Sequence, residues 1–331
     1  MDELKISNSR YMGNLDCFQN LIDIDDFFGW DDDSLLNLKG MVETNPFNML
    51  VIALSIKRCR PFWGKASYYP PKNEKTDKYL QYMGFYETCG IPNRDIQRGG
   101  RRMGKYICIT KIDLSPQGSI SADYDMIEYE AKQLARMFQF DKKLADYLLY
   151  CFFEMIRNVY EHAKTNHVYV CAQYWPMHSL MEIAIADEGC GIQKAMQKRY
   201  SNMSEQDLIN HAMKPGISAL TNHSYLEKDD PYGNSGYGLY ITKELALAYG
   251  GSFILCSGNY AKRYYKKGYI PVEKDFSTKF QGTAIAIRFR TDMNIDFNET
   301  ITKIKDKAES KSKSIEGAIH KASKSSGGKR Q

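Results

Sequence analysis

The spacing of hydrophobic and polar residues changes several times along the chain, which predicts a mixture of helices and strands. In the amino-terminal part, the continuous apolar run Met49–Ile56 has the length of a strand and predicts a central, buried one. Residues 76–88 place Tyr, Leu and Met at helical spacing and end near Gly90, a residue type that often stops helices. A second strand is predicted over Lys105–Ile112. Together these elements predict a small α/β region that ends in the Pro- and Gly-containing segment 114–118.

Beyond residue 118 the pattern predicts two helices followed by strands and further helices. The expected helices cover residues 123–138, 193–200, 238–249 and a longer stretch from the N-cap Asp141 to about Ala163. The expected strands cover residues 168–174, 180–186, 252–257 and 283–289. Residues 202–235 are polar and irregular, and a loop of this length in a compact domain is usually functional or mobile.

Composition adds a division into two domains and a tail. The 331 residues are enough for two domains with sizeable cores. The formal charge of +5 belongs to residues 301–331, which hold nine Lys and Arg against three Asp and Glu, whereas the rest holds 36 against 37. From about Ala308 the tail lacks a core-forming pattern, so we expect it to be disordered. The predicted organisation is a small α/β regulatory or interaction domain over residues 1–118, a second domain over 119–300, and a basic tail over 301–331.

The sequence predicts a cytoplasmic protein. The start, Met1–Lys5, lacks the basic and apolar regions of a signal peptide, and the longest aliphatic run is too short to cross a bilayer. The eight cysteines are scattered, with no Cys-x-x-Cys pair and no zinc-ligand spacing. The basic tail is suited to an acidic partner, an anionic lipid surface or, less favoured, a nucleic acid, and a plain solubilising tail is an equal alternative.

The clearest candidate chemistry lies on the long helix, where Glu154, Asn158 and His162 are spaced four residues apart and share one face. Their neighbours are mostly apolar, and a polar stripe in such a helix is costly unless it meets a polar partner. A magnesium–phosphate group is one such partner, since an Asn oxygen can bind Mg²⁺ and a carboxylate can accept a proton from water. Taken alone, the stripe favours an ordinary amphipathic helix whose polar side faces water.

The strand over residues 180–186 ends at Asp187, where a carboxylate can accept a hydrogen bond from an exocyclic amine such as that of adenine. Gly189 and Gly191 follow, and glycines allow the backbone to approach a flat base closely. A strand followed by a glycine turn is common, so this segment is moderately specific.

Two further glycine segments complete the set. Gly233, Gly236 and Gly238 open a helix, and the exposed amides at a helix N-terminus bind phosphate. Gly282-Thr283 precedes the last strand and indicates nothing on its own.

In this order, the four segments resemble the GHKL superfamily of ATP-binding domains, which includes DNA gyrase, a heat-shock chaperone, histidine kinases and the MutL proteins. The resemblance covers about residues 122–290. It implies a Bergerat-type α/β sandwich, in which helices cover one face of a mixed sheet, here preceded by a smaller α/β domain. It also implies ATP and Mg²⁺ as cofactors.

The resemblance also implies roles for single residues. Glu154 corresponds to the general base and Asn158 to the Mg²⁺ ligand, while residues 193–235 correspond to the ATP lid. The other residues that it places around the nucleotide are His162, Asp187, Gly189, Gly191, Ile192, Gly233, Gly236, Gly238, Leu239 and Thr283.

Within the superfamily, the spacing of Glu154, Asn158 and His162 is similar to the N box of anti-sigma-factor serine kinases. Many histidine kinases carry Lys or Arg at the position of Glu161, and no histidine precedes His162 to accept a phosphoryl group, so a conventional histidine kinase is not expected. The prediction is an intracellular regulatory switch that hydrolyses ATP or phosphorylates a protein partner. The alternative is a non-catalytic interaction module gated by nucleotide.

The amino-terminal region resembles a STAS-like regulatory domain more loosely, and an unrelated α/β module is an equal alternative. The sequence leaves the oligomeric state open, a homodimer included.

Overall fold

The computed structural model describes residues 2–8, 16–27, 34–59, 67–91, 104–219 and 235–323. Within them, the strands are β1 (Asp2–Asn8), β2 (Ser34–Met41), β3 (Ser67–Tyr69), β4 (Tyr106–Asp113), β5 (His167–Trp175), β6 (Leu180–Asp187), β7 (Ser252–Lys267) and β8 (Ile270–Arg290). The helices are α1 (Cys17–Asp26), α2 (Pro46–Cys59), α3 (Glu74–Tyr82), α4 (Phe85–Thr88), α5 (Ile120–Arg136), α6 (Lys142–His162), the 3₁₀ turn η2 (Pro176–His178), α7 (Gly191–Met196), α8 (Glu205–Ala212), α9 (Gly238–Ala248) and α10 (Phe297–Ser312).

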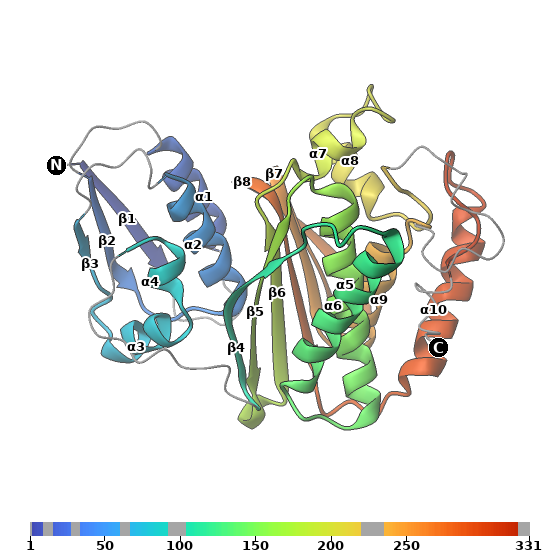
Figure 1. Ribbon diagram of the computed structural model, residues 1–331, viewed down its shortest axis with the longest axis horizontal. Helices are drawn as coiled ribbons and strands as arrows, with labels where there is room; N and C mark the ends of the chain where they lie inside the picture. The colour runs from blue at the N-terminus through green and yellow to red at the C-terminus, as the bar shows by residue number, and fades with distance from the viewer. Residues whose placement is uncertain are drawn as a thin grey trace.

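The larger of two sheets has five strands in the order β4-β5-β6-β8-β7. Helices α5, α6 and α9 cover one of its faces, and α10 lies outside them (Figure 1). This arrangement agrees with the α/β sandwich predicted from the sequence, and a smaller α/β part precedes it. The expectation of a mixed sheet is wrong, because every neighbouring pair in the larger sheet is antiparallel. The short connections between β5 and β6 and between β7 and β8 can join only antiparallel neighbours.

Strand β4 confirms the strand predicted over residues 105–112. It pairs with β5 at the edge of the larger sheet, not with the strands of the amino-terminal part. The division of the chain at residue 118 stays a prediction.

The second face of the larger sheet is covered by α1 and α2 (Figure 1). Ala184 and Ala286 of the sheet belong to the same buried cluster as Met49 and Ile52 of α2. The strand predicted over Met49–Ile56 is therefore wrong, because this segment is the middle of a helix. Over residues 46–54 the helix is buried on every side between two sheets, so this stretch shows no exposed polar face and reads as a continuous apolar run.

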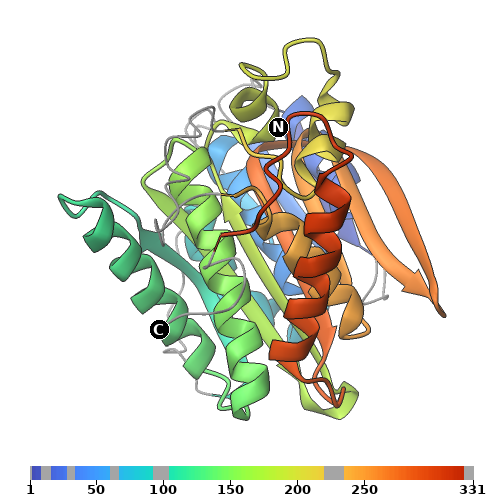
Figure 2. The same cartoon turned by 90° about the vertical axis from the view of Figure 1, so that its right-hand side faces the viewer.

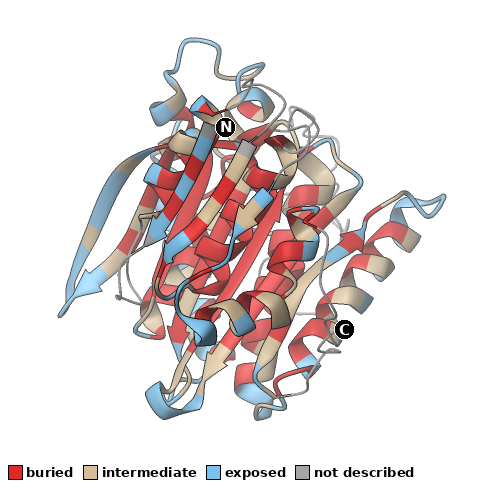
Figure 3. Cartoon of the chain, turned by 90° about the vertical axis from the view of Figure 1, so that its left-hand side faces the viewer, coloured by how far each residue is buried: buried red, intermediate tan, exposed pale blue. Residues whose placement is uncertain are grey.

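The smaller sheet contains β1, β2 and β3 in that order, with parallel pairing throughout. Parallel neighbours need crossover connections, and α1 and α2 supply them. The molecule thus consists of stacked layers, with the buried residues concentrated along the strands and the inner helices (Figure 3).

Strands β7 and β8 are much longer than the segments 252–257 and 283–289 that the pattern predicts. Their outer halves form a hairpin that projects past the other strands (Figure 2). Residues 266–271 at its end are exposed and lack the apolar alternation of a half-buried strand, so the pattern gave no sign of them.

Two expectations of irregular structure are also wrong. Helix α8 lies within the segment 202–235, where Ser204 caps it by accepting a hydrogen bond from the amide of Asp207 at 3.1 Å. The tail is ordered from Ala308 to residue 323, since α10 runs to Ser312 and packs against α9. Residues 324–331 lie outside the described part of the chain. Among the described helices, none is both long and apolar enough to cross a bilayer.

Candidate functional site

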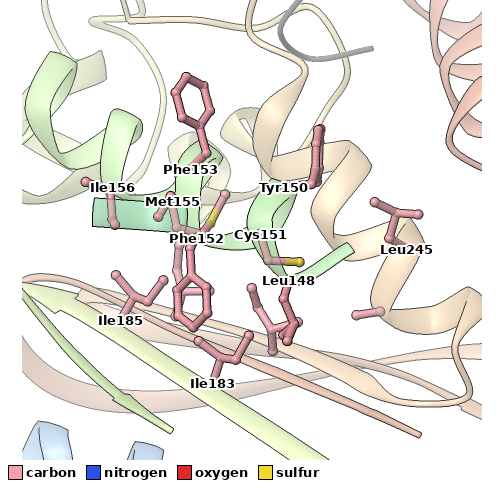
Figure 4. Close-up of a cluster of buried hydrophobic side chains, with 14 of the residues drawn as sticks. Leu148, Tyr150, Cys151, Phe152, Phe153, Met155, Ile156, Ile183, Ile185 and Leu245 are labelled. Carbon is pink, nitrogen blue, oxygen red and sulfur yellow. The ribbon is translucent and has the colours of Figure 1, made fainter. Parts of the chain in front are cut away.

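Helix α6 forms the inner wall of the site. Asp141 caps it by accepting a hydrogen bond from the amide of Leu144 at 3.0 Å, as predicted. Its apolar side chains, such as Phe152, point toward Ile183 and Ile185 of β6 (Figure 4). This packing fixes the rotation of the helix and turns Glu154 and Asn158 toward the first residue of α9, because residues three to four apart share a face.

Helix α9 begins with Gly238, which touches both of these side chains. A Cβ atom at this position would lie 2.5 Å from Oε2 of Glu154 and 3.7 Å from Nδ2 of Asn158. A side chain at this position would displace the carboxylate of Glu154, so glycine lets the N-terminus of α9 approach α6 closely. The preceding Gly236 has φ +70°, and a Cβ there would lie 2.4 Å from the carbonyl oxygen of Ile217.

Asp187 lies at the end of β6, opposite Thr283 of β8. Its Oδ1 accepts a hydrogen bond from the amide of Gly189 at 2.8 Å, and the side chain is 2% exposed. Burial raises the pKa of this carboxyl to about 7, although the amides of Gly189 and Thr283 act in the opposite direction. An acid in this position is therefore poised between its two protonation states near neutral pH.

These elements enclose one cavity of about 790 Å³, counting its open mouth. Nine of the predicted residues line it, namely Asn158, His162, Asp187, Gly191, Ile192, Gly236, Gly238, Leu239 and Thr283. The four sequence segments thus converge in space, while the role of each residue stays a prediction.

The other three predicted residues do not line the cavity within the described part of the chain. Glu154 lies behind Gly238, buried to 2% exposure. Gly189 packs against the end of α6, where a Cβ would lie 2.0 Å from the carbonyl oxygen of Ala163. Gly233 lies outside the described residues, as does the stretch 220–234 of the predicted lid.

His162 lies at the cavity as a half-buried side chain. Burial lowers its pKa; Glu161 opposes this effect and Arg157 adds to it. The imidazole is therefore neutral at pH 7 and adds no positive charge to the cavity. Glu161 instead forms a buried ion pair with Arg157, at 2.6 Å from carboxylate to Nε, so it serves the packing of α6.

Sequence reasoning missed two groups of residues around the cavity. The first is Ser257, whose hydroxyl accepts a hydrogen bond from the amide of Ile192 at 3.0 Å and donates to the carbonyl of Gly282 at 2.7 Å. It joins the two glycine segments across the sheet. The second is the apolar wall made by Met196, Ala212 and Ile217, residues of the predicted lid that the sequence did not single out. Neither group has a sequence signal, because each depends on contacts between distant segments.

A comparison with protein families bears on this geometry. Residues 144–293 match the model of the histidine kinase-, DNA gyrase B- and HSP90-like ATPases. This part of the chain is a GHKL-type ATPase domain. The match supports ATP binding by the GHKL-type domain. No curated protein and no solved structure matched the chain.

The cavity of the GHKL-type domain suits a magnesium–nucleotide group. The Nδ2 atom of Asn158 is shielded from solvent and has no hydrogen-bond partner within the described residues, so the amide is available to a ligand. Next to it, Gly236 and Gly238 at the start of α9 line the cavity, and backbone amides at a helix N-terminus can bind an anion. The described residues contain no cluster of three or more His, Cys, Asp or Glu that would hold a metal without phosphate oxygens. A magnesium ion that enters bound to a triphosphate receives part of its ligands from phosphate oxygens, so it would need fewer than three such protein ligands.

Proposed function

We propose that the GHKL-type domain binds Mg-ATP and uses it catalytically, by hydrolysis or by phosphorylating a protein partner, as part of an intracellular regulatory switch. The observation that carries the proposal is the position of Glu154 and Asn158. One helical turn apart on α6, both side chains face Gly238, and Gly238 lines the cavity. A base and a metal ligand are needed side by side at the phosphate end of an ATP site.

In this proposal each residue acts through its own chemistry. Glu154 accepts the proton of the attacking water or hydroxyl at its carboxylate, and Asn158 binds the magnesium ion through its amide oxygen. Asp187 and Thr283 hold the adenine of the nucleotide at the other end of the cavity. Bound Mg-ATP supplies the transferable phosphoryl group and the metal charge that neutralises it.

Replacing Glu154 by Gln tests the proposed base. The substitution keeps the size of the side chain and removes its ability to take a proton, so ATP turnover should fall by about 10²- to 10⁴-fold. The dissociation constant for ATP should change only a few-fold. The measurements are phosphate release and transfer of labelled phosphate to protein, each with magnesium present.

Glu128→Gln is the matched control, because Glu128 lies on α5 and pairs there with Lys132 at 2.6 Å. It should keep the wild-type rate. Equal turnover by the Glu154→Gln variant and the wild-type protein would remove Glu154 as the base.

A specific contact favours a second candidate, a nucleotide-gated interaction module. Lys57 of α2 contacts Glu188 at 2.5 Å and the hydroxyl of Tyr169 at 2.7 Å. Glu188 directly follows Asp187, so the amino-terminal part touches the segment at the proposed adenine end of the cavity. Nucleotide binding would then change the surface offered to a partner. Recovery of a bound partner with ATP, with ADP and without nucleotide tests this candidate, and equal recovery in all three contradicts it.

A further inference from the structure

The segment that follows α10, residues 313–323, lies across the outer side of the cavity wall, and we call it the strap. After Ser312 the chain turns back over the end of the helical layer (Figure 2). The amide of Ile319 in the strap donates to the carbonyl of Gly216 at 2.8 Å, and the amide of Gly216 donates to the carbonyl of Gly236 at 3.1 Å. The strap, the segment at 216 and the second glycine motif are therefore joined in one hydrogen-bonded row.

A second connection runs through Tyr237, which lies between Gly236 and Gly238. Its ring is fully buried, and its hydroxyl donates to the carbonyl of Ile319 at 2.8 Å. The same hydroxyl lies 2.9 Å from Oγ of Ser312 at the end of α10. The residue between two glycines of the phosphate motif is thus held by the carboxy-terminal segment.

The row extends to Ser235 on the other side of the motif. The amide of Ser323 donates to Oγ of Ser235 at 2.9 Å. Arg199, which follows α7, adds a cross-link, since one guanidinium donates to the carbonyls of Ser218 and Gly317, each at 2.9 Å. Ser218 itself lines the cavity.

Packing supports the same arrangement. Ile315 and Ala318 of the strap pack against a small apolar cluster that contains Met196 and Ile217. Both of these residues line the cavity. Gly216 permits the close approach, because a Cβ there would lie 2.2 Å from the carbonyl oxygen of Ile319. The strap thus supports the wall from behind, while the ligand side of the same wall faces the cavity.

We propose that the strap is a working part of the nucleotide site: through Tyr237 and Gly216 it positions the second glycine motif and the adjoining wall for ATP. Tyr237 is a positioning residue, since its hydroxyl points to the strap and not to the cavity. The proposal rests on ATP binding by the GHKL-type domain. It implies reciprocity, because a strap that strengthens ATP binding must itself be held more firmly when ATP is bound.

Two truncated chains test the proposal by their dissociation constants for ATP with magnesium present. The chain that ends at Ser312 lacks the strap, and we expect at least tenfold weaker binding. The chain that ends at Ser323 keeps the strap and should bind within twofold of the full-length protein. Equal affinity of both truncated chains and the full-length protein overturns the role of the strap and leaves the proposed function intact. Absence of ATP binding by the full-length protein overturns both.

Full-length variants decide the case if the shorter chain does not fold. Tyr237→Phe removes only the hydroxyl, and we expect roughly three- to tenfold weaker ATP binding, the range of one hydrogen bond. Tyr249→Phe is the matched control, because the Tyr249 hydroxyl is buried without a hydrogen-bond partner among the described residues. It should leave the ATP affinity unchanged. Equal affinities of the two variants overturn the proposal.

Hydrogen exchange of the strap separates positioning from general stability. In the wild-type protein, ATP should slow exchange of the Ile319 amide at least several-fold, and the Asp187→Asn variant should lose this protection along with its ATP binding. An exchange rate at Ile319 that is the same with and without saturating ATP overturns the proposal.

Discussion

At the scale of single residues, the site combines charged groups with unusually little exposure. Asp187 is the clearest case, because its carboxyl is buried at the end of a strand and burial raises its pKa to about 7. A structural acid would more often be paired with a cation. A carboxyl group whose pKa is raised by burial and which faces a cavity is typical of a ligand site.

This pKa predicts a dependence of stability on pH. The folded protein holds the proton of Asp187 more tightly than the unfolded chain, whose ordinary pKa is 3.8. The resulting stabilisation is complete below that value and is lost as the pH rises through about 7, with an upper limit on the order of 4 kcal/mol. Asp187→Asn keeps an oxygen that accepts from Gly189 but cannot ionise, so its stability should gain on the wild type as the pH rises from about 4 to 7. Melting curves of both proteins without ATP measure this, and parallel pH profiles contradict the assignment.

The residue scale also shows which parts of the site a sequence can reveal. The positions of Asn158 and Asp187 at the cavity were predictable because each has a side chain with distinct chemistry in a recognisable motif. Ser257 was not, because a serine in a strand has no distinguishing pattern and acts here through backbone groups of two other segments.

At the scale of elements, α6 and α2 mark the two extremes of prediction. Helix α6 has an N-cap, a polar stripe and an apolar face, and the sequence predicted its start and end closely. Helix α2 has an apolar run that matches a strand, and only its neighbours on both sides explain why it is a helix. Hydrophobic periodicity distinguishes the side of an element that faces water from the side that faces the core. Prediction from this periodicity therefore fails for a stretch that is buried on every side.

The cap of α6 gives a prediction at this scale. Asp141→Ala removes the acceptor of the Leu144 amide, and such a loss at a helix N-terminus costs about 0.5–2 kcal/mol. Because α6 packs on the central strands, the free energy of unfolding of the whole domain should fall by this amount. Asp141→Ser keeps an acceptor and should restore most of it. Denaturant unfolding measures the difference, and equal loss in both variants would mean that the hydroxyl or carboxylate cap is not the cause.

At the scale of the whole molecule, the amino-terminal part is joined to the sheet by a buried charge. Glu182 of β6 is 2% exposed and accepts a hydrogen bond from the amide of Phe47, near the start of α2, at 3.1 Å. Its other oxygen accepts from Nε of Arg288 at 2.7 Å. One carboxylate thus satisfies a helix N-terminus and a largely buried arginine together.

Removing one member of this pair should cost more than removing both. Glu182→Leu leaves Arg288 without its carboxylate partner in a largely buried position, for which about 3–5 kcal/mol of destabilisation is expected. The double change Glu182→Leu, Arg288→Met removes both charges and should cost clearly less. Unfolding by denaturant gives all the values of the cycle. Additive losses would show that the two side chains do not interact.

The tail also belongs to the scale of the molecule. Its Ser- and Lys-rich sequence resembles disordered segments, and its order up to residue 323 depends on backbone hydrogen bonds to Gly216 and Ser235. Such bonds use the main chain of the tail and leave no mark in its composition, so composition does not predict them.

The position of α2 between two sheets also has a consequence for how the chain is made. A ribosome completes α2 long before it reaches β6 and β8, so one side of this apolar helix must wait for strands that do not yet exist. Nascent chains in that state expose an apolar surface that can bind chaperones or other nascent chains. Synthesis, more than the finished protein, is therefore the stage at which this architecture is most vulnerable.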